Sequence, residues 1–269
     1  MTYLQAIVLG IVQGLTEFIP VSSSGHLVIV PHLLGWEFSH AQAFVFDVLV
    51  QWGTLLAVFI YFRRDLVTIG LAFVRGVVGG RPFADPDSRM GWYLVLATLP
   101  AVVVGLAAKD LVESAFASPR ATGIFLLGTA LLLVIAERVG HRNRSMEEMT
   151  WGDALWIGCS QVLALLPGIS RSGSTIAGGM TRHLDRPSAA RFSFLMSVPV
   201  MVGAGILALK DLAALPAADH FLLPLLAGFL AALVSGYIAI RWLLAYLGRH
   251  SLYGFAVYCV LLGLLVLFL

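Results

Sequence analysis

Charged residues are scarce in this 269-residue sequence. Asp, Glu, Lys and Arg make up 12% of the chain, whereas a soluble domain averages about 25%. Hydrophobic residues account for 59%, and the mean hydropathy is +0.91. This composition excludes an ordinary soluble domain and predicts an integral membrane protein.

The sequence also lacks a charge excess and a cysteine framework. Its formal net charge is only +2 and its basic residues are spread over several loops, so we expect no nucleic-acid partner. Cys159 and Cys259 both lie in apolar runs, which leaves neither a disulfide framework nor a CxxC motif. The first apolar run, 3–19, has no Lys- or Arg-rich start, so we read it as mature protein rather than a signal peptide.

Six apolar segments come close to the length of about 20 residues that a helix needs to cross a bilayer. They cover about 41–62, 92–109, 121–136, 189–209, 221–242 and 252–269. Two more apolar regions, 3–35 and 151–184, are interrupted by proline and by serine–glycine turns. Irregular backbone at membrane depth is tolerated only against protein or a water-filled cavity. We therefore expect an all-α membrane protein with six transmembrane helices and two re-entrant helical hairpins.

The two interrupted regions resemble each other. Gly10 and Gln13 recur as Gly158 and Gln161, and PVSSSG from position 20 recurs as PGISRSG from position 167 with one residue inserted. Three spans follow each copy, and an odd number of spans gives the copies opposite orientations. We expect one membrane domain, 1–269, built as an inverted-topology repeat of about 1–137 and 150–269, with the two hairpin tips meeting inside it.

Arginine positions indicate the orientation, because short cytoplasmic loops are enriched in Lys and Arg. The segment 63–91, read as a loop, holds five arginines, and the loop 137–150 holds three. Threading six spans places Arg182, Arg186, Arg241 and Arg249 on the same side. With that side cytoplasmic, both termini lie outside.

The serine–glycine tips carry the chemistry of an anion site. Glycine and serine in a tight turn let backbone NH groups converge on an anion, and serine hydroxyls add donors. Arg171 adds a planar guanidinium suited to phosphate, and an arginine at this depth marks a functional site with a partner, either Glu17 or a phosphate. The structural alternative is that the small residues serve helix packing and that Arg171 only forms an ion pair with Glu17.

Two other side chains near the first tip are candidates. His26 stands beside three hydroxyls, as a base stands beside its nucleophile; the alternative is a helix cap after Gly25. Gln13 lies four residues before Glu17, so both occupy one helix face.

The stretches QGLTEFIPVSSSGHL from position 13 and PGISRSGSTIAGG from position 167 are similar to the motifs of the bacterial undecaprenyl-pyrophosphate phosphatases of the bacitracin-resistance type. Their order, the chain length and the hydropathy also agree, so the resemblance covers effectively the whole sequence. It implies hydrolysis of the C55 lipid diphosphate to the monophosphate at the outer face of the bacterial cytoplasmic (inner) membrane. This reaction recycles the carrier for peptidoglycan and other wall polymers and is linked to bacitracin resistance. The resemblance also implies a divalent cation, Mg²⁺ or Ca²⁺, contact with membrane lipids, and homodimers.

Carried onto this sequence, the resemblance implies a catalytic set and a diphosphate-binding set. The catalytic residues are Glu17, Ser23, His26 and Arg171. The diphosphate-binding residues are Ser22, Ser24, Gly25, Ser170, Ser172, Gly173 and Thr175. Some members have Glu where this chain has Gln13, so one negative charge is missing, and a cation would take ligands from Glu17 and the Gln13 carbonyl.

Several alternatives stay open. We expect Ser23, activated by His26, to attack the terminal phosphorus, but His26 acting on water or attacking directly is an alternative. A lipid transporter or flippase is the main rival function, because inverted repeats with broken helices are typical of alternating access; a non-catalytic lipid receptor is a third. The type-2 phosphatidic acid phosphatases share short fragments of both motifs, but they carry a histidine six residues after the arginine, where this chain has Ala177.

Overall fold

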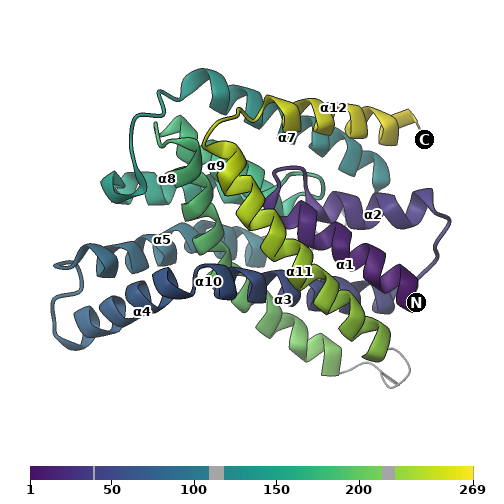
Figure 1. The fold of residues 1–269 in the computed structure, drawn as a ribbon, viewed down its shortest axis with the longest axis horizontal. Coiled ribbons are helices and arrows are strands. Elements are labelled where there is room, and N and C mark those ends of the chain that lie inside the picture. Colours follow the sequence, from purple (N-terminus) through teal and green to yellow (C-terminus); the bar gives the residue numbers. More distant parts are fainter. Residues whose placement is uncertain (39, 109–117, 214–221, 269) are drawn as a thin grey trace.

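The computed structural model describes residues 1–38, 40–108, 118–213 and 222–268, and its regular elements there are helices (Figure 1). They are α1 (Tyr3–Phe18), α2 (Ser23–Leu33), α3 (His40–Tyr61), α4 (Arg63–Val78), α5 (Pro86–Ala107), α7 (Pro119–Val139), η1 (Met146–Glu148), α8 (Trp151–Val162), η2 (Leu163–Leu165), α9 (Arg171–Thr181), α10 (Arg186–Ala213), α11 (Leu222–Leu247) and α12 (Tyr253–Phe268). Three stretches, Pro86–Ala107, Arg120–Val139 and Leu223–Leu247, are long and apolar enough to cross a membrane. The all-α class is confirmed, and these helices agree with a multi-pass membrane protein.

The sequence predicts the positions of the long helices correctly. Each of the six expected spans falls on one helix: α3, α5, α7, α10, α11 or α12. Their predicted ends at 109, 221 and 269 lie outside the described residues. The two interrupted regions do break at the prolines and serines, since α1 ends at Phe18 before α2 begins, and α8 and η2 end before α9 begins at Arg171.

The segment 63–91 is only partly the loop that the sequence analysis assumed, because α4 fills its first half. The helix packs along α5 and buries Ile69. Asp65 lies in its first turn and Arg75 in its last, which suits the helix dipole. The arginines made this segment read as a polar loop, whereas its apolar residues have the helical period.

The repeated glycines have the same packing role in both copies. Helix α1 packs along α11, and α8 packs along α5. A Cβ added to Gly10 would lie 2.2 Å from the Gly228 carbonyl oxygen, and one added to Gly158 would lie 2.5 Å from the Ala97 carbonyl oxygen. Glycine at both positions therefore lets the first helix of each interrupted pair touch the backbone of a long helix.

A buried aromatic cluster anchors the end of α1. Phe18 is fully buried and meets Phe194 of α10 edge to face, with ring centroids 5.2 Å apart. Such edge-to-face pairs are favoured by the ring quadrupoles. Because Glu17 precedes Phe18 in α1, this packing also fixes the position of the Glu17 side chain at the end of the helix.

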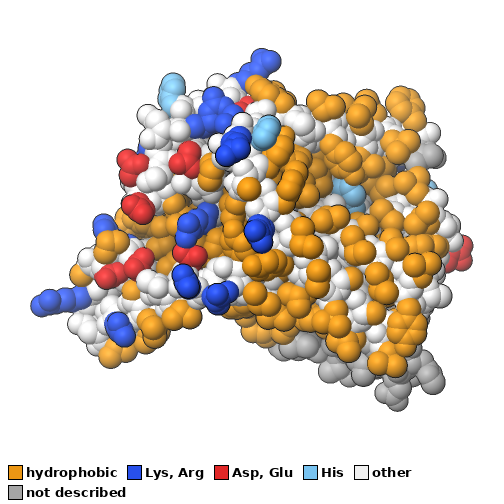
Figure 2. Space-filling view, in the orientation of Figure 1, with side chains coloured by type: hydrophobic (Ala, Val, Ile, Leu, Met, Phe, Trp, Pro, Cys, Tyr) orange, Lys and Arg blue, Asp and Glu red, His pale blue; other side chains and the backbone are white. Residues whose placement is uncertain are grey.

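Charged side chains gather at one end of the molecule, around α4, α5 and α8, and apolar side chains cover α11 and α12 (Figure 2). Both chain termini lie at the opposite end (Figure 1). At the charged end, four arginines predicted to share a side form ion pairs. Arg142 and Arg186 pair with Glu137, and Arg144 and Arg182 pair with Asp153. These four members of the predicted group therefore do lie close together.

Asp153 tests how much this charged end stabilises the fold. Its carboxylate is completely buried and lies 2.7 Å from nitrogens of both Arg144 and Arg182. Burial alone would raise the pKa of Asp153, but hydrogen bonds from these arginines and from Thr150 outweigh it and hold the pKa below its usual range. Such a carboxyl stabilises the fold above its unfolded pKa of about 4, and this contribution is lost as the pH falls below that value.

We expect Asp153→Asn to lower the free energy of unfolding by about 3 kcal/mol at neutral pH, because it leaves two arginines without their anion. Thermal unfolding of the purified protein in detergent measures this, with the exposed Glu147→Gln as control. The difference in unfolding temperature between variant and wild type should become smaller below pH 4. Equal unfolding temperatures at pH 7 would show that this ion-pair cluster does not stabilise the protein.

Candidate active site

The first polar turn joins α1 to α2 and is held by its own serines. Ser22 has φ 71°, a left-handed value that is uncommon for a residue with a side chain. Its Oγ accepts a hydrogen bond from the Gly25 NH at 3.3 Å and so caps α2, and it lies 3.3 Å from the Ser24 Oγ. This turn presents Ser23 as the first residue of α2.

The second polar turn repeats this side-chain cap, although its capping serine has an extended backbone, with φ −71°. Ser170 caps α9 by accepting a hydrogen bond from the Gly173 NH at 3.0 Å, and its Oγ lies 3.2 Å from the Ser172 Oγ. Arg171 is the first residue of α9. It therefore stands where Ser23 stands in the first copy.

The two turns touch each other, as the sequence repeat predicts. The Ser172 hydroxyl donates to the Ile19 carbonyl oxygen at 3.4 Å. A Cβ added to Gly173 would lie 3.4 Å from the Pro20 Cβ and 2.9 Å from the Ser170 Cβ. A side chain at position 173 would therefore clash with Ser170 of its own turn, whereas Pro20 of the first turn is at ordinary van der Waals distance.

Glu17 connects the two motifs. Its Oε2 accepts hydrogen bonds from the Ser23 hydroxyl at 2.6 Å and from the Gln13 Nε2 at 3.0 Å. Its Oε1 lies 2.7 Å from the Arg171 Nη2 in a salt bridge. Glu17 is 8% exposed, and the Arg171 side chain 15%. One nearly buried carboxylate thus binds Ser23 and Arg171, which start two different helices. Glu17, Ser23, Arg171 and Gln13 together form a polar cluster.

His26 lies beside this cluster but does not bond the serine. Its Nδ1 is 2.7 Å from the Ser22 carbonyl oxygen, and its Nε2 is 2.7 Å from the Tyr258 hydroxyl of α12. The expected pairing of His26 with Ser23 is therefore not formed, and Glu17 takes its place. Both ring nitrogens of His26 have other partners.

Comparison with known proteins gives the same assignment as the motifs. The family described as "Bacitracin resistance protein BacA" matches residues 6–265. The chain belongs to this family. An undecaprenyl-diphosphatase of Gemmatimonas aurantiaca is 47% identical over 99% of this chain and 97% of its own, and one of Chlorobaculum tepidum is 44% identical over 98% and 95%. A third, of Myxococcus xanthus, is 42% identical over 100% of this chain and 89% of its own.

Three supporting residues of this BacA-family site were not predicted. Tyr258 bonds His26, Ser193 of α10 accepts a hydrogen bond from the Arg171 Nη1 at its carbonyl oxygen, 3.1 Å away, and Thr129 of α7 holds the second turn through Gly168 and Ser170. Each is a hydroxyl residue on a helix outside the two motifs. Other hydroxyl residues lie on the same helices, so the sequence does not single these three out.

Thr175 lies behind the second turn rather than on it. Its hydroxyl is 2.6 Å from the Ser193 Oγ and 2.8 Å from the Arg171 carbonyl oxygen, and the residue is 1% exposed. Its contacts therefore brace the first turn of α9. The other predicted diphosphate-binding residues, Ser22, Ser24, Gly25, Ser170, Ser172 and Gly173, all lie in or next to the two turns.

The residues at the cluster fit a hard divalent cation. The Gln13 Oε1 is buried and has no hydrogen-bond partner, although it belongs to the side chain that bonds Glu17. Amide and carboxylate oxygens are the ligands that Mg²⁺ and Ca²⁺ prefer. No group of three or more His, Cys, Asp or Glu residues suited to a metal occurs among the described residues, so the protein would supply few of the ligands.

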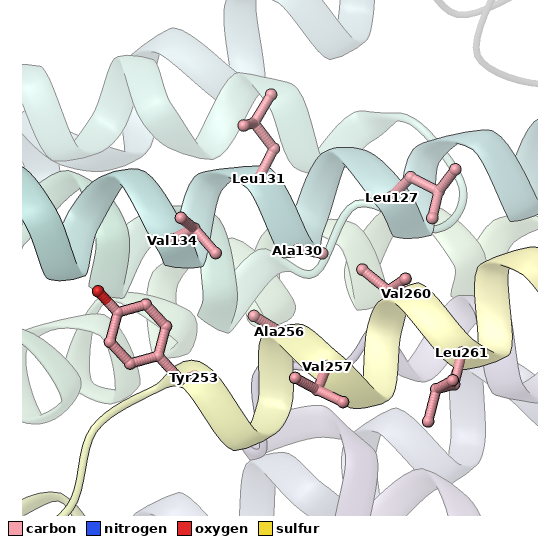
Figure 3. Close-up of a pocket in the computed structure, with 9 residues that line it drawn as sticks. All are labelled: Leu127, Ala130, Leu131, Val134, Tyr253, Ala256, Val257, Val260 and Leu261. Carbon is pink, nitrogen blue, oxygen red and sulfur yellow. The ribbon is translucent and has the colours of Figure 1, made fainter.

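An apolar groove of about 400 Å³ runs between α7 and α12 (Figure 3). Leu127 and Val134 line it from α7, and Val257 and Val260 line it from α12. Val257 is followed in the chain by Tyr258, which bonds His26. The groove thus lies along the helix that contacts the cluster.

Proposed function

We propose that this protein hydrolyses undecaprenyl diphosphate to undecaprenyl phosphate and inorganic phosphate, which recycles the lipid carrier for cell-wall synthesis and confers bacitracin resistance. The family match and relatives named undecaprenyl-diphosphatase support this function. The observation that carries it is the joint contact of Glu17 with Ser23 and Arg171, from motifs far apart in the sequence. Hydrolysis of a phosphoanhydride needs an oriented nucleophile and a cation at the transferred phosphoryl group, and these residues supply both.

The geometry favours Glu17 as the group that takes the Ser23 proton. The Ser23 hydroxyl already donates to the Glu17 carboxylate at 2.6 Å, which is within reach for proton transfer. The serine oxygen would then bond the terminal phosphorus while the bond to the bridging oxygen breaks, and undecaprenyl phosphate leaves. Water next attacks the phosphoserine, so that inorganic phosphate leaves and the serine hydroxyl is restored. His26 acting on water is the alternative, and a phosphoenzyme trapped on Ser23 separates the two.

Arg171 and the two helix starts would hold the diphosphate. The first NH groups of a helix have no partner within the helix and favour anions. Ser23 and Ser24 open α2, and Arg171 and Ser172 open α9. The hydrogen bond from Arg171 to the Ser193 carbonyl oxygen keeps its guanidinium in place. Two anion-binding helix starts and one guanidinium therefore lie around a single headgroup.

A divalent cation, Mg²⁺ or Ca²⁺, belongs to the proposal, with Glu17 and the free Gln13 Oε1 as its protein ligands. When bound, it would neutralise charge on the phosphate oxygens. Arg171 already balances the charge of Glu17, so the negative charge of a bound diphosphate would need a further cation.

The topology that we propose is an inverted repeat with six spans and two re-entrant hairpins, α1–α2 and α8–α9. The packing supports it: exchanging the two copies maps the pair α1 and α11 onto α8 and α5, and maps the pair α3 and α11 onto α10 and α5. The matching caps of α2 and α9 support it too. With the arginine-rich end in the cytoplasm, the termini and the opening of the site face outward.

The groove between α7 and α12 would hold part of the isoprenoid tail. Val260→Trp fills it, and we expect the KM for undecaprenyl diphosphate to rise about tenfold, equivalent to ~1.4 kcal/mol of lost apolar contact. The KM for a five-carbon diphosphate, which has too short a tail, should stay unchanged. Leu265→Trp, also on α12 but outside the groove, is the control. An equal rise for both substrates would place the tail elsewhere.

Phosphate release by the purified protein in detergent tests the proposed function. With no membrane gradient, we expect one inorganic phosphate for each undecaprenyl diphosphate consumed, and much less after chelation of divalent cations. Lipid movement in vesicles without phosphate release would favour the transporter, and tight binding without turnover would favour the receptor.

A further inference from the structure

The hydrogen bonds of His26 determine where its proton sits. The Ser22 carbonyl oxygen, 2.7 Å from Nδ1, can only accept, so Nδ1 must carry hydrogen. In the neutral ring Nε2 then has the lone pair, and the Tyr258 hydroxyl, 2.7 Å away, must donate to it. Neutral His26 is therefore held as the Nδ1–H tautomer with its basic nitrogen facing α12.

We propose that Tyr258 is a positioning residue of the phosphatase site, which acts on the reaction through His26. This inference rests on the proposed function and adds a residue to it. The Tyr258 hydroxyl donates to Nε2 of neutral His26, and its oxygen accepts from the Nε2–H of the protonated ring. One phenol therefore fixes the ring orientation in both protonation states.

Tyr258 contacts His26 with both its hydroxyl and its ring, and its surroundings require only the ring. The residue is 43% exposed on a surface of apolar neighbours, where a phenylalanine would pack as well. The planes of the two rings are parallel within 3°, with centroids 5.7 Å apart. His26 itself is only 7% exposed. Without the Tyr258 hydroxyl, its nearly buried Nε2 would lose its hydrogen bond, which is unfavourable.

The same contact separates two roles at the site. Because Tyr258 occupies Nε2, Ser23 is left to Glu17, whose carboxylate bonds it directly. His26 would then act on a different oxygen from the serine hydroxyl, such as water or the departing phosphate, when Tyr258 yields Nε2 to that oxygen. Tyr258 would support this second role and not the first.

Tyr258→Phe tests the proposal because it removes only the hydroxyl. We expect kcat for undecaprenyl diphosphate to fall about tenfold with KM within twofold, since a hydrogen bond to the catalytic ring is lost and the headgroup contacts remain. The matched control is Tyr246→Phe, whose ring also stacks on a histidine, His250, but away from the motifs. It should leave both constants unchanged.

A double variant separates positioning from a general structural effect. If Tyr258 acts through His26, adding Tyr258→Phe to His26→Gln should not slow the enzyme further. The proposal is overturned if Tyr258→Phe keeps kcat within twofold of wild type, raises KM alone, or slows the His26→Gln protein by the same factor as the wild type. Thermal unfolding confirms beforehand that each variant is folded.

Discussion

Arg171→Ala is expected to lower kcat/KM for undecaprenyl diphosphate by about a thousandfold or more, the range found when an arginine is removed from a phosphoryl-transfer site. Its guanidinium is the cation that the described structure places at both turns, with one nitrogen on Glu17 and another on the Ser193 carbonyl oxygen. Arg171→Lys should recover only part of the loss, because an ammonium lacks the planar fork. Phosphate release at several substrate concentrations gives the value.

The control for Arg171 is Arg138→Ala, an exposed arginine at the charged end, which should retain full activity. The Arg171 variants must first unfold at a temperature near that of the wild type, because removing one partner of a nearly buried ion pair destabilises a protein. A folded Arg171→Ala protein with normal kcat/KM would mean that the Glu17–Arg171 pair is structural only.

Glu17→Gln is expected to lower kcat by about a hundredfold to ten-thousandfold, the usual contribution of a general base. The amide keeps the shape of the carboxylate but cannot take the Ser23 proton, and it removes the charge that faces Arg171. Single-turnover phosphate release measures the chemical step apart from product release. The exposed Glu37→Gln is the matched control and should behave as wild type.

Ser23→Ala then distinguishes the two mechanisms. If the serine is the nucleophile, its loss should match or exceed that of Glu17→Gln, and a phosphoenzyme should accumulate only when Ser23 is present. Near-normal turnover of Ser23→Ala would eliminate the serine route and leave His26 acting on water.

The sequence predicts the fold well wherever one physical signal dominates. Long apolar runs place the helices, and the prolines and serine–glycine pairs place both breaks. The internal repeat predicts that the two turns meet, and the hydrogen bond from Ser172 to the Ile19 carbonyl oxygen agrees with this. Helix α4 was not predicted, because its arginines were taken as a sign of a polar loop and the helical period of its apolar residues was not considered.

The site was harder to predict than the fold, because side-chain direction decides it. Ser23 and His26 are near in sequence and seemed a natural pair, but helical side chains lean toward the N-terminus. His26 therefore reaches back to the Ser22 carbonyl, and Ser23 meets Glu17 of the preceding helix. Tyr258 comes from the last helix, and no local pattern connects it to His26.

A double-mutant cycle of Glu17→Gln and Arg171→Ala tests most directly whether the two motifs build one site. These side chains touch across the motifs, with 2.7 Å between Oε1 and Nη2, and groups that act as a unit give non-additive losses of kcat/KM. We expect the double variant to be about as slow as the worse single variant. A loss equal to the product of the two single losses would contradict a shared site, because the two groups would then act independently.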